Sequence, residues 1–153
     1  MPPARGAIPY LVIKDAAAAI AFYQQVFGAE QLLRLDAPDG KPMHAELRVG
    51  PASFMLTEER PEYGALSPLT IGGSATTSTL YVPDADAVFG AALAAGAQQL
   101  MPVMDQFWGD RSGALSDPFG HKWMIATHKE EPSEDELRRR LAAMMAGMPN
   151  VRH

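Results

Sequence analysis

The sequence predicts an α+β fold of two tandem β-α-β-β-β modules, followed by a C-terminal helix. Three observations predict it. A pattern of one strand, an Ala-rich helix and three strands occurs twice, short blocks match between the two copies, and a segment rich in Pro and Gly separates them. The modules span residues 8–58 and 76–128 of a domain that covers 1–129, and the tail covers 130–153.

The first module begins with a short apolar strand from Ile8 to Lys14. A helix is predicted from Asp15 to Phe27, because apolar residues recur at helical spacing and Gly28 follows as a stop signal. Three strands complete the module, and turn sequences separate the second from the third and the third from the fourth. These strands are Glu30–Leu35, Met43–Val49 and Ser53–Glu58.

The second module repeats this order, with a strand from Thr76 to Val82 and a helix from Asp84 to Ala95 that ends at Gly96. Asp-Ala opens the helix in both copies, and Gly-Ala follows it in both, at spacings that differ by one residue. Three further strands follow, and a tight turn, Asp117-Pro118-Phe119-Gly120, precedes the last of them. These strands are Gln98–Met104, Trp108–Ser116 and His121–His128.

Two segments lie outside the repeat. Residues 59–75 have little periodicity and read as a linker or loop. The tail from Glu130 to His153 reads as a helix that begins with a capping box at Ser133 and carries one apolar stripe. The stripe is Leu137, Leu141, Met144, Met145 and Met148. Such a stripe packs either on the helix's own domain or on a dimer partner.

Composition excludes several classes of function. A net charge of −5 and a pI near 5.3 argue against nucleic acid and anionic membranes as partners. Because the chain has no Cys, it has no disulfide, no thiolate metal site and no Cys nucleophile. The first residues lack the apolar stretch of a signal peptide, and no apolar run reaches transmembrane length. We therefore expect a cytoplasmic protein.

The second module ends in two motifs, Trp108-Gly109-Asp110-Arg111 and Asp117-Pro118-Phe119-Gly120-His121. Together with the duplicated modules they resemble the vicinal oxygen chelate superfamily, which includes glyoxalase I, extradiol dioxygenases, fosfomycin resistance enzymes and bleomycin resistance proteins. The resemblance covers residues 8–128. It implies two curled mixed sheets around a concave cleft, often completed by a symmetric dimer, so we expect a homodimer.

In the metalloenzymes of that superfamily, His and Glu ligands lie on the first and fourth strands of each module. The corresponding positions here are Ile8, Met55, Thr77 and Met124. None of these side chains is an imidazole or a carboxylate, which divalent metals prefer, and a shift by one residue supplies neither. We therefore expect no metal at this site and no cofactor, and we expect the four side chains to converge in a cleft that binds a ligand.

Strand alternation adds further residues to the face of this cleft. They are Tyr10, Val12, Thr79 and Tyr81. Phe107 and Trp108 open the seventh strand, where they form either a wall that stacks on a flat ligand or part of the core. Trp123 has the opposite parity and is expected to pack in the core, and His121, beside the turn, is expected to be a hydrogen-bonding turn residue.

The third strand presents one polar face. Met43, Ala45, Leu47 and Val49 alternate as its core side, which leaves His44, Glu46 and Arg48 toward the cleft or solvent. His44 and Glu46 are the candidate catalytic residues, as a base with an orienting carboxylate or as two ligands of a displaced metal. The same pattern is also found on an ordinary solvated face, and it is compatible with ligand contact by His44. His128 and His153 carry no signal of their own.

Two functions follow from these observations. The first is a metal-independent small-molecule binding protein of the glyoxalase/bleomycin-resistance type, which sequesters an aromatic or amphipathic compound and thereby confers antibiotic resistance. The alternative is a glyoxalase-like lyase or isomerase, or a dioxygenase-related enzyme, that uses His44 and Glu46. The sequence does not identify the ligand.

Overall fold

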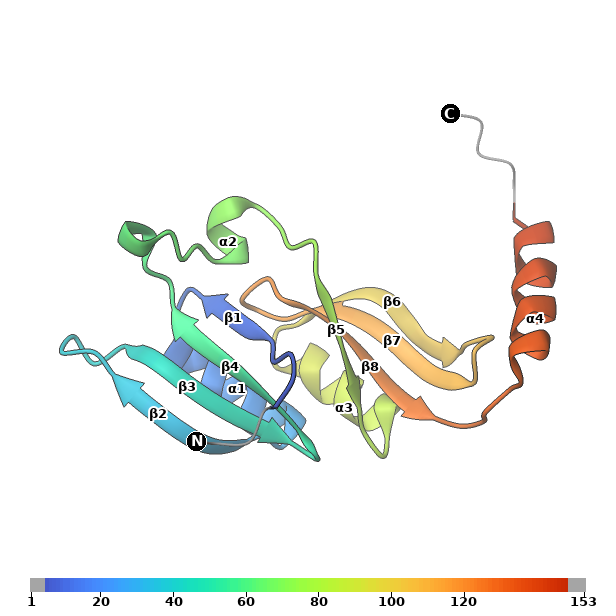
Figure 1. The fold of residues 1–153 in the computed structure, drawn as a ribbon, viewed down its shortest axis with the longest axis horizontal. Coiled ribbons are helices and arrows are strands. Elements are labelled where there is room, and N and C mark those ends of the chain that lie inside the picture. Colours follow the sequence, from blue (N-terminus) through green and yellow to red (C-terminus); the bar gives the residue numbers. More distant parts are fainter. Residues whose placement is uncertain (1–4, 149–153) are drawn as a thin grey trace.

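The computed structural model describes residues 5–148 and contains two four-stranded mixed sheets, each covered on one face by a helix (Figure 1). The elements follow the predicted order twice. The first module contains β1 (Tyr10–Ile13), α1 (Ala16–Phe27), β2 (Glu30–Asp36), β3 (Pro42–Val49) and β4 (Ala52–Glu58). The second contains β5 (Thr77–Tyr81), α3 (Ala85–Ala94), β6 (Gln98–Asp105), β7 (Asp110–Ser116) and β8 (Lys122–His128). The predicted duplicated fold is confirmed.

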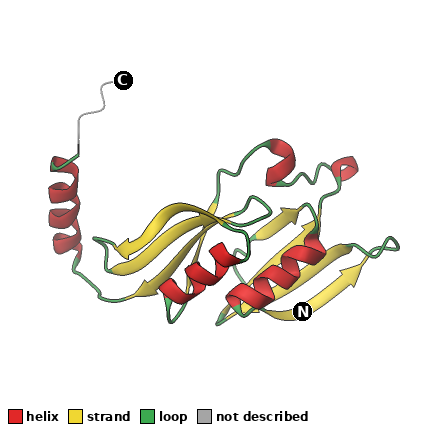
Figure 2. Cartoon of the chain, turned by 180° about the vertical axis from the view of Figure 1, so that it is seen from behind, coloured by secondary structure: helices red, strands yellow, loops and turns green. Residues whose placement is uncertain are grey.

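Both sheets have the same topology. Strand order is β1-β4-β3-β2 in sheet 1 and β5-β8-β7-β6 in sheet 2, with the first pair parallel and the other pairs antiparallel. In Figure 2, α1 and α3 lie side by side on the same side of the two sheets. We call this side of each sheet its helix-covered face and the opposite side its open face.

The helices begin in equivalent ways. The N–H of Ala16 donates to the carboxylate of Glu58 at 2.6 Å, and the N–H of Ala85 donates to the hydroxyl of Thr127 at 2.8 Å. Glu58 and Thr127 both lie near the end of the strand that pairs in parallel with the first strand of its module. The last strand of each module therefore satisfies one of the free backbone donors at the start of its helix.

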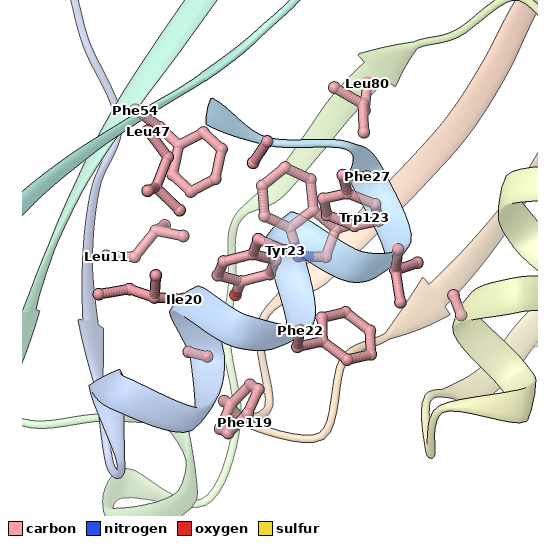
Figure 3. Close-up of a cluster of buried hydrophobic side chains, with 14 of the residues drawn as sticks. Leu11, Ile20, Phe22, Tyr23, Phe27, Leu47, Phe54, Leu80, Phe119 and Trp123 are labelled. Atoms are coloured by element: carbon pink, nitrogen blue, oxygen red, sulfur yellow. The ribbon is translucent and has the colours of Figure 1, made fainter. Parts of the chain in front are cut away.

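The core joins the two modules through α1 (Figure 3). Tyr23 is completely buried there and contacts the rings of Phe27, Phe54 and Trp123. Its hydroxyl donates to Asp117, which also accepts the indole N–H of Trp123 at 2.9 Å. Burial, together with the charge of Asp117, raises the pKa of Tyr23 well above its ordinary value. Trp123 is thus a core residue, as predicted.

The turn before β8 also connects the modules. Asp117 accepts backbone N–H groups from Phe119 at 2.9 Å and His121 at 3.0 Å, and Gly120 supplies the positive φ of 88°. The imidazole Nε2 of His121 lies 2.9 Å from the carbonyl oxygen of Val12 on β1. The predicted role of His121 as a hydrogen-bonding turn residue is confirmed, and its partner belongs to the other module.

Several element boundaries differ from the prediction. Strand β1 begins at Tyr10 rather than Ile8, and β7 begins at Asp110, so that Phe107 and Trp108 lie in the preceding turn. The predicted linker contains the 3-10 helix η1 (Pro61–Tyr63) and the short helix α2 (Pro68–Ile71). Each begins with Pro, and Ser67 caps α2 by accepting the N–H of Thr70.

The alternation predicted for β3 fails at its start. Pro42 is buried and Met43 is exposed, because the β2–β3 ladder is irregular between Leu35 and Asp36. Val49, at the other end of the strand, is only partly buried.

The C-terminal helix α4 (Glu134–Ala146) projects from the end of sheet 2, away from both modules (Figure 1). It is shorter than the predicted tail, and residues 149–153, with His153, lie outside the described part. Ser133 caps it as predicted, but none of its residues is buried. In the single chain, the apolar stripe of α4 is therefore not packed on its own domain. In residues 5–148, no helix has the length and apolarity needed to cross a membrane.

Candidate functional site

The open face of sheet 1 carries three of the predicted ligand-binding residues. Tyr10 and Met55 are register partners, and Met55 is in turn the partner of Glu46 on β3. The ring of His44 stacks on Tyr10, with 5.8 Å between ring centroids and 19° between planes. Tyr10 is 51% exposed, so this stacked pair forms an accessible aromatic surface.

Glu46 lies on the same face, but its carboxylate is engaged away from His44. It accepts the hydroxyl of Ser53 at 3.2 Å and forms an ion pair with Arg5. His44 instead contacts Tyr10. This arrangement gives His44 an aromatic environment, whereas Glu46 is a buried group held by its own partners.

The open face of sheet 2 carries four more predicted residues. Thr79 pairs with Met124, Tyr81 pairs with Ala126, and Thr77 pairs with Lys122. The alternate residues of these strands, such as Trp123 and Ile125, lie in the core beneath α3 and α1. Thr77, Thr79, Tyr81 and Met124 therefore share the open face, as strand periodicity predicts.

A hydrogen-bonded cluster occupies one end of this face. Asp110 and His128 are register partners on β7 and β8, and Asp110 is only 3% exposed. Its carboxylate accepts the hydroxyl of Tyr81 at 2.7 Å, the indole N–H of Trp108 at 3.0 Å and His128 Nδ1 at 2.9 Å. The other imidazole nitrogen of His128 lies 3.0 Å from a carboxylate oxygen of Glu131. We call these four residues with Asp110 the Asp110 cluster.

The hydrogen bonds of the Asp110 cluster shift the pKa values of Asp110, Tyr81 and His128. Burial would raise the pKa of Asp110, but the hydrogen bonds from His128, Tyr81 and Trp108 outweigh it and hold the pKa below its usual value. The same bonds to Asp110 raise the pKa of Tyr81 and, together with Glu131, the pKa of His128. Because both imidazole nitrogens face carboxylate oxygens, only the imidazolium can donate at both sides.

Trp108 is positioned by a glycine and by the tail. Gly109 has a φ of 103°, and a Cβ there would lie 2.3 Å from the carbonyl oxygen of Glu130. The Gly109 carbonyl accepts the N–H groups of Lys129 and Glu130, and the carbonyl of Phe107 accepts Arg140. The chain beyond β8 therefore packs directly on the turn that holds Trp108.

A pocket of about 450 Å³ lies where the two modules meet. It is lined in part by Ile8, Tyr10, Thr76, Ser78, His121 and Lys122. A smaller pocket of about 270 Å³ adjoins it beneath α2 and shares Tyr10, Thr76 and His121 with it. Ile8 thus lies at the module junction, while Met55 and Met124 lie on the open faces of different sheets.

Comparison with known proteins decides the family. Residues 7–125 match the model of the Glyoxalase/Bleomycin resistance protein/Dioxygenase superfamily. The chain belongs to this superfamily. An uncharacterized protein of Mycobacterium tuberculosis strain H37Rv, Rv0887c, is 40% identical over 142 residues, which cover 91% of this chain and 84% of that protein. Protein YjdN of Escherichia coli K12 is 26% identical over 82% of this chain and 97% of its own length.

Several solved structures are similar to this fold. TioX from Micromonospora sp. ML1 has a TM-score of 0.63 at 27% identity and covers 83% of this chain and 98% of its own. Protein PA1353 from Pseudomonas aeruginosa has a TM-score of 0.66 at 27% identity, with 83% and 100% covered. The fosfomycin resistance protein FosX of Listeria monocytogenes shares the fold, with a TM-score of 0.60 at 15% identity over 88% of this chain and 98% of its own.

The metal site of the superfamily's metalloenzymes does not fit the residues present here. Ile8, Met55, Thr77 and Met124 are the residues at the four positions that the resemblance implies, and they offer an alkyl group, a hydroxyl and two thioethers. Within residues 5–148, no three His, Asp or Glu side chains gather closely enough to hold a metal ion. We derive no chemistry through a metal.

Sequence reasoning missed the Asp110 cluster. It named Asp110 only as part of a motif and assigned no role to His128. Arg111, the neighbour of Asp110 in that motif, binds Asp86 at 2.7 Å across the helix-covered face. The missed signal was the register of the last hairpin. Asp117 pairs with His121 across the turn, so counting outward places Asp110 opposite His128.

Proposed function

We propose that this chain is a metal-independent small-molecule binding protein that sequesters an aromatic or amphipathic compound on the open faces of its sheets. The observation that carries the proposal is the composition of those faces. Large apolar and aromatic side chains lie exposed around a few polar groups, which is the usual composition of a ligand site. They are Tyr10, Leu33 and Leu35 on sheet 1 and Tyr81, Met101 and Met104 on sheet 2.

The proposal includes a homodimer. Monomeric proteins rarely expose such extensive apolar surface, and the stripe of α4 adds to it with Leu141, Met144 and Met145. A second copy that covers part of these faces would turn open surfaces into an enclosed cleft. Light scattering at high protein concentration tests this expectation, and a monomer would contradict it.

We further propose a cytoplasmic location and a role in resistance to a toxic aromatic compound. The family membership supports the role, because the superfamily contains drug-binding as well as catalytic members. The ligand, the location and the resistance phenotype are parts of the proposal.

The experiment is a titration of aromatic antibiotics and metabolites followed by Trp fluorescence. Trp108→Ala and His44→Ala should each weaken binding about tenfold, since each removes one stacking or hydrogen-bonding contact. Tyr63→Ala is a matched control, because Tyr63 is a highly exposed aromatic residue on η1, outside the two sheets. The melting temperature should change little in His44→Ala and Tyr63→Ala, and it should fall in Trp108→Ala, which removes a donor from the buried Asp110.

If ligands bind tightly and neither substitution alters their affinity, the site is wrongly assigned. If no ligand binds, but a substrate is turned over and His44→Ala abolishes turnover, the alternative enzyme with His44 and Glu46 is correct.

A further inference from the structure

The Asp110 cluster presents an oriented imidazole, that of His128, beside an apolar surface. His128 donates to a buried carboxylate through Nδ1, so its ring is oriented and its other N–H points outward. Its partner in the described part of the chain is Glu131, whose side chain is 90% exposed. An exposed ion pair of this kind contributes little stability and is easily replaced.

Glu131 is held near His128 by the backbone rather than by the ion pair. Residues 129 and 130 donate to the Gly109 carbonyl, and this anchors the segment that carries Glu131. The backbone of residue 131 therefore stays beside His128, while its exposed side chain is free to turn away. In the ligand-free chain, the Glu131 carboxylate lies 3.0 Å from His128 Nε2, where the carboxylate of a ligand would bind.

A second observation on the same face points to a ligand. Ser112 is only 1% exposed, and its buried hydroxyl has no hydrogen-bond partner among residues 5–148. Ser112 lies two residues from Asp110 on β7 and is the register partner of Ala126 and Met104. Buried hydroxyls normally have a partner, so this donor on the open face has spare capacity for an acceptor.

We propose that His128, oriented by Asp110, binds the carboxylate of an aromatic ligand, and that Glu131 occupies this position in the ligand-free chain. The apolar part of the ligand lies against the half-exposed side chains of Tyr81 and Met104 on the same face. This inference rests on the proposed function and narrows it to aromatic carboxylates.

The test uses 1-naphthoate and 1-naphthamide, two probes with the same ring system, of which only the first is an anion. Binding is measured at one ionic strength by Trp fluorescence. The wild-type protein should bind naphthoate about tenfold more tightly than naphthamide, as one charge-assisted hydrogen bond predicts. His128→Gln should abolish the preference and leave naphthamide binding unchanged.

Glu131→Gln changes only an exposed member of the Asp110 cluster and leaves the buried groups of the cluster intact. Removing the competing carboxylate should increase the affinity for naphthoate about two- to threefold, with no effect on naphthamide. Glu134→Gln is the matched control, since it makes the same change of charge at a residue that pairs with Arg138 on α4. It should alter neither affinity.

Equal affinities of the two probes, or a preference that survives in His128→Gln, would overturn this inference. If naphthamide binds and Trp108→Ala weakens it, the proposed function stands without the carboxylate. If neither probe binds at millimolar concentration, both proposals fail.

Discussion

Two buried aspartates at opposite ends of β7 have nearly the same set of partners. Asp117 accepts a Tyr hydroxyl and a Trp indole N–H, from Tyr23 and Trp123. Asp110 also accepts a Tyr hydroxyl and a Trp indole N–H, from Tyr81 and Trp108. The acceptor chemistry is the same at both ends of the strand.

The donors differ in their surroundings. Tyr23 and Trp123 are buried, and two backbone N–H groups of the turn complete the coordination of Asp117. Tyr81 is 58% exposed, and the third partner of Asp110 is a half-exposed imidazole. The comparison shows that burial of the donors determines the role of each aspartate. Asp117, whose donors are buried, links the two modules. Asp110, whose donors are exposed to solvent, orients groups that a ligand can reach.

The largest expected effect is on stability. Asp117→Ala leaves Tyr23, Trp123 and two backbone donors unpaired in the core, and we expect a loss of about 3–5 kcal/mol in the free energy of unfolding. Asp110→Ala should lose only about 1–2 kcal/mol, because its donors can turn to water. Urea unfolding measures both values. Equal losses would remove the distinction between the two ends of β7.

Gly109→Ala tests whether the tail segment fixes the Asp110 cluster. A side chain at φ 103° is strained and meets the Glu130 carbonyl, so we expect a loss of about 1–3 kcal/mol, with Glu131 displaced from His128. Gly73→Ala is the control, since Gly73 has no positive φ and open space around it. Urea unfolding and the pKa of His128 are the readouts. Unchanged values of both would show that the segment moves freely.

The sequence predicted the fold well because hydrophobic alternation and helix caps are local signals. The matched pairs at Asp15-Ala16 and Asp84-Ala85 already marked two equivalent helix starts. The site was only partly predictable. Strand parity predicted which face Tyr81 and Met124 share. The Asp110 cluster, however, depends on cross-strand register and on hydrogen bonds from residues 129 and 130 to the Gly109 carbonyl. Those contacts join residues far apart in the sequence, and no local pattern specifies them.

The acid–base behaviour of His128 gives a smaller effect. Its pKa is raised in the folded protein by Asp110 and then by Glu131, so its stabilising contribution is complete below about pH 6.5, the unfolded value. It is lost as the pH rises through the folded pKa. Asp110→Asn should lower the pKa of His128 toward its ordinary value, as measured by an NMR titration of the imidazole protons. If the substitution leaves the pKa of His128 unchanged, the contact with Asp110 is not what raises that pKa.

The most direct test uses the chain's two tryptophans, whose indole N–H groups each mark one aspartate. A ¹H–¹⁵N spectrum resolves both indole signals, and 1-naphthoate is added stepwise. The account predicts that the Trp108 signal shifts in a saturable manner while the Trp123 signal stays in place. A shift of the Trp123 signal alone, or equal shifts of both, would contradict the assignment of the Asp110 end to ligand binding and the Asp117 end to structure.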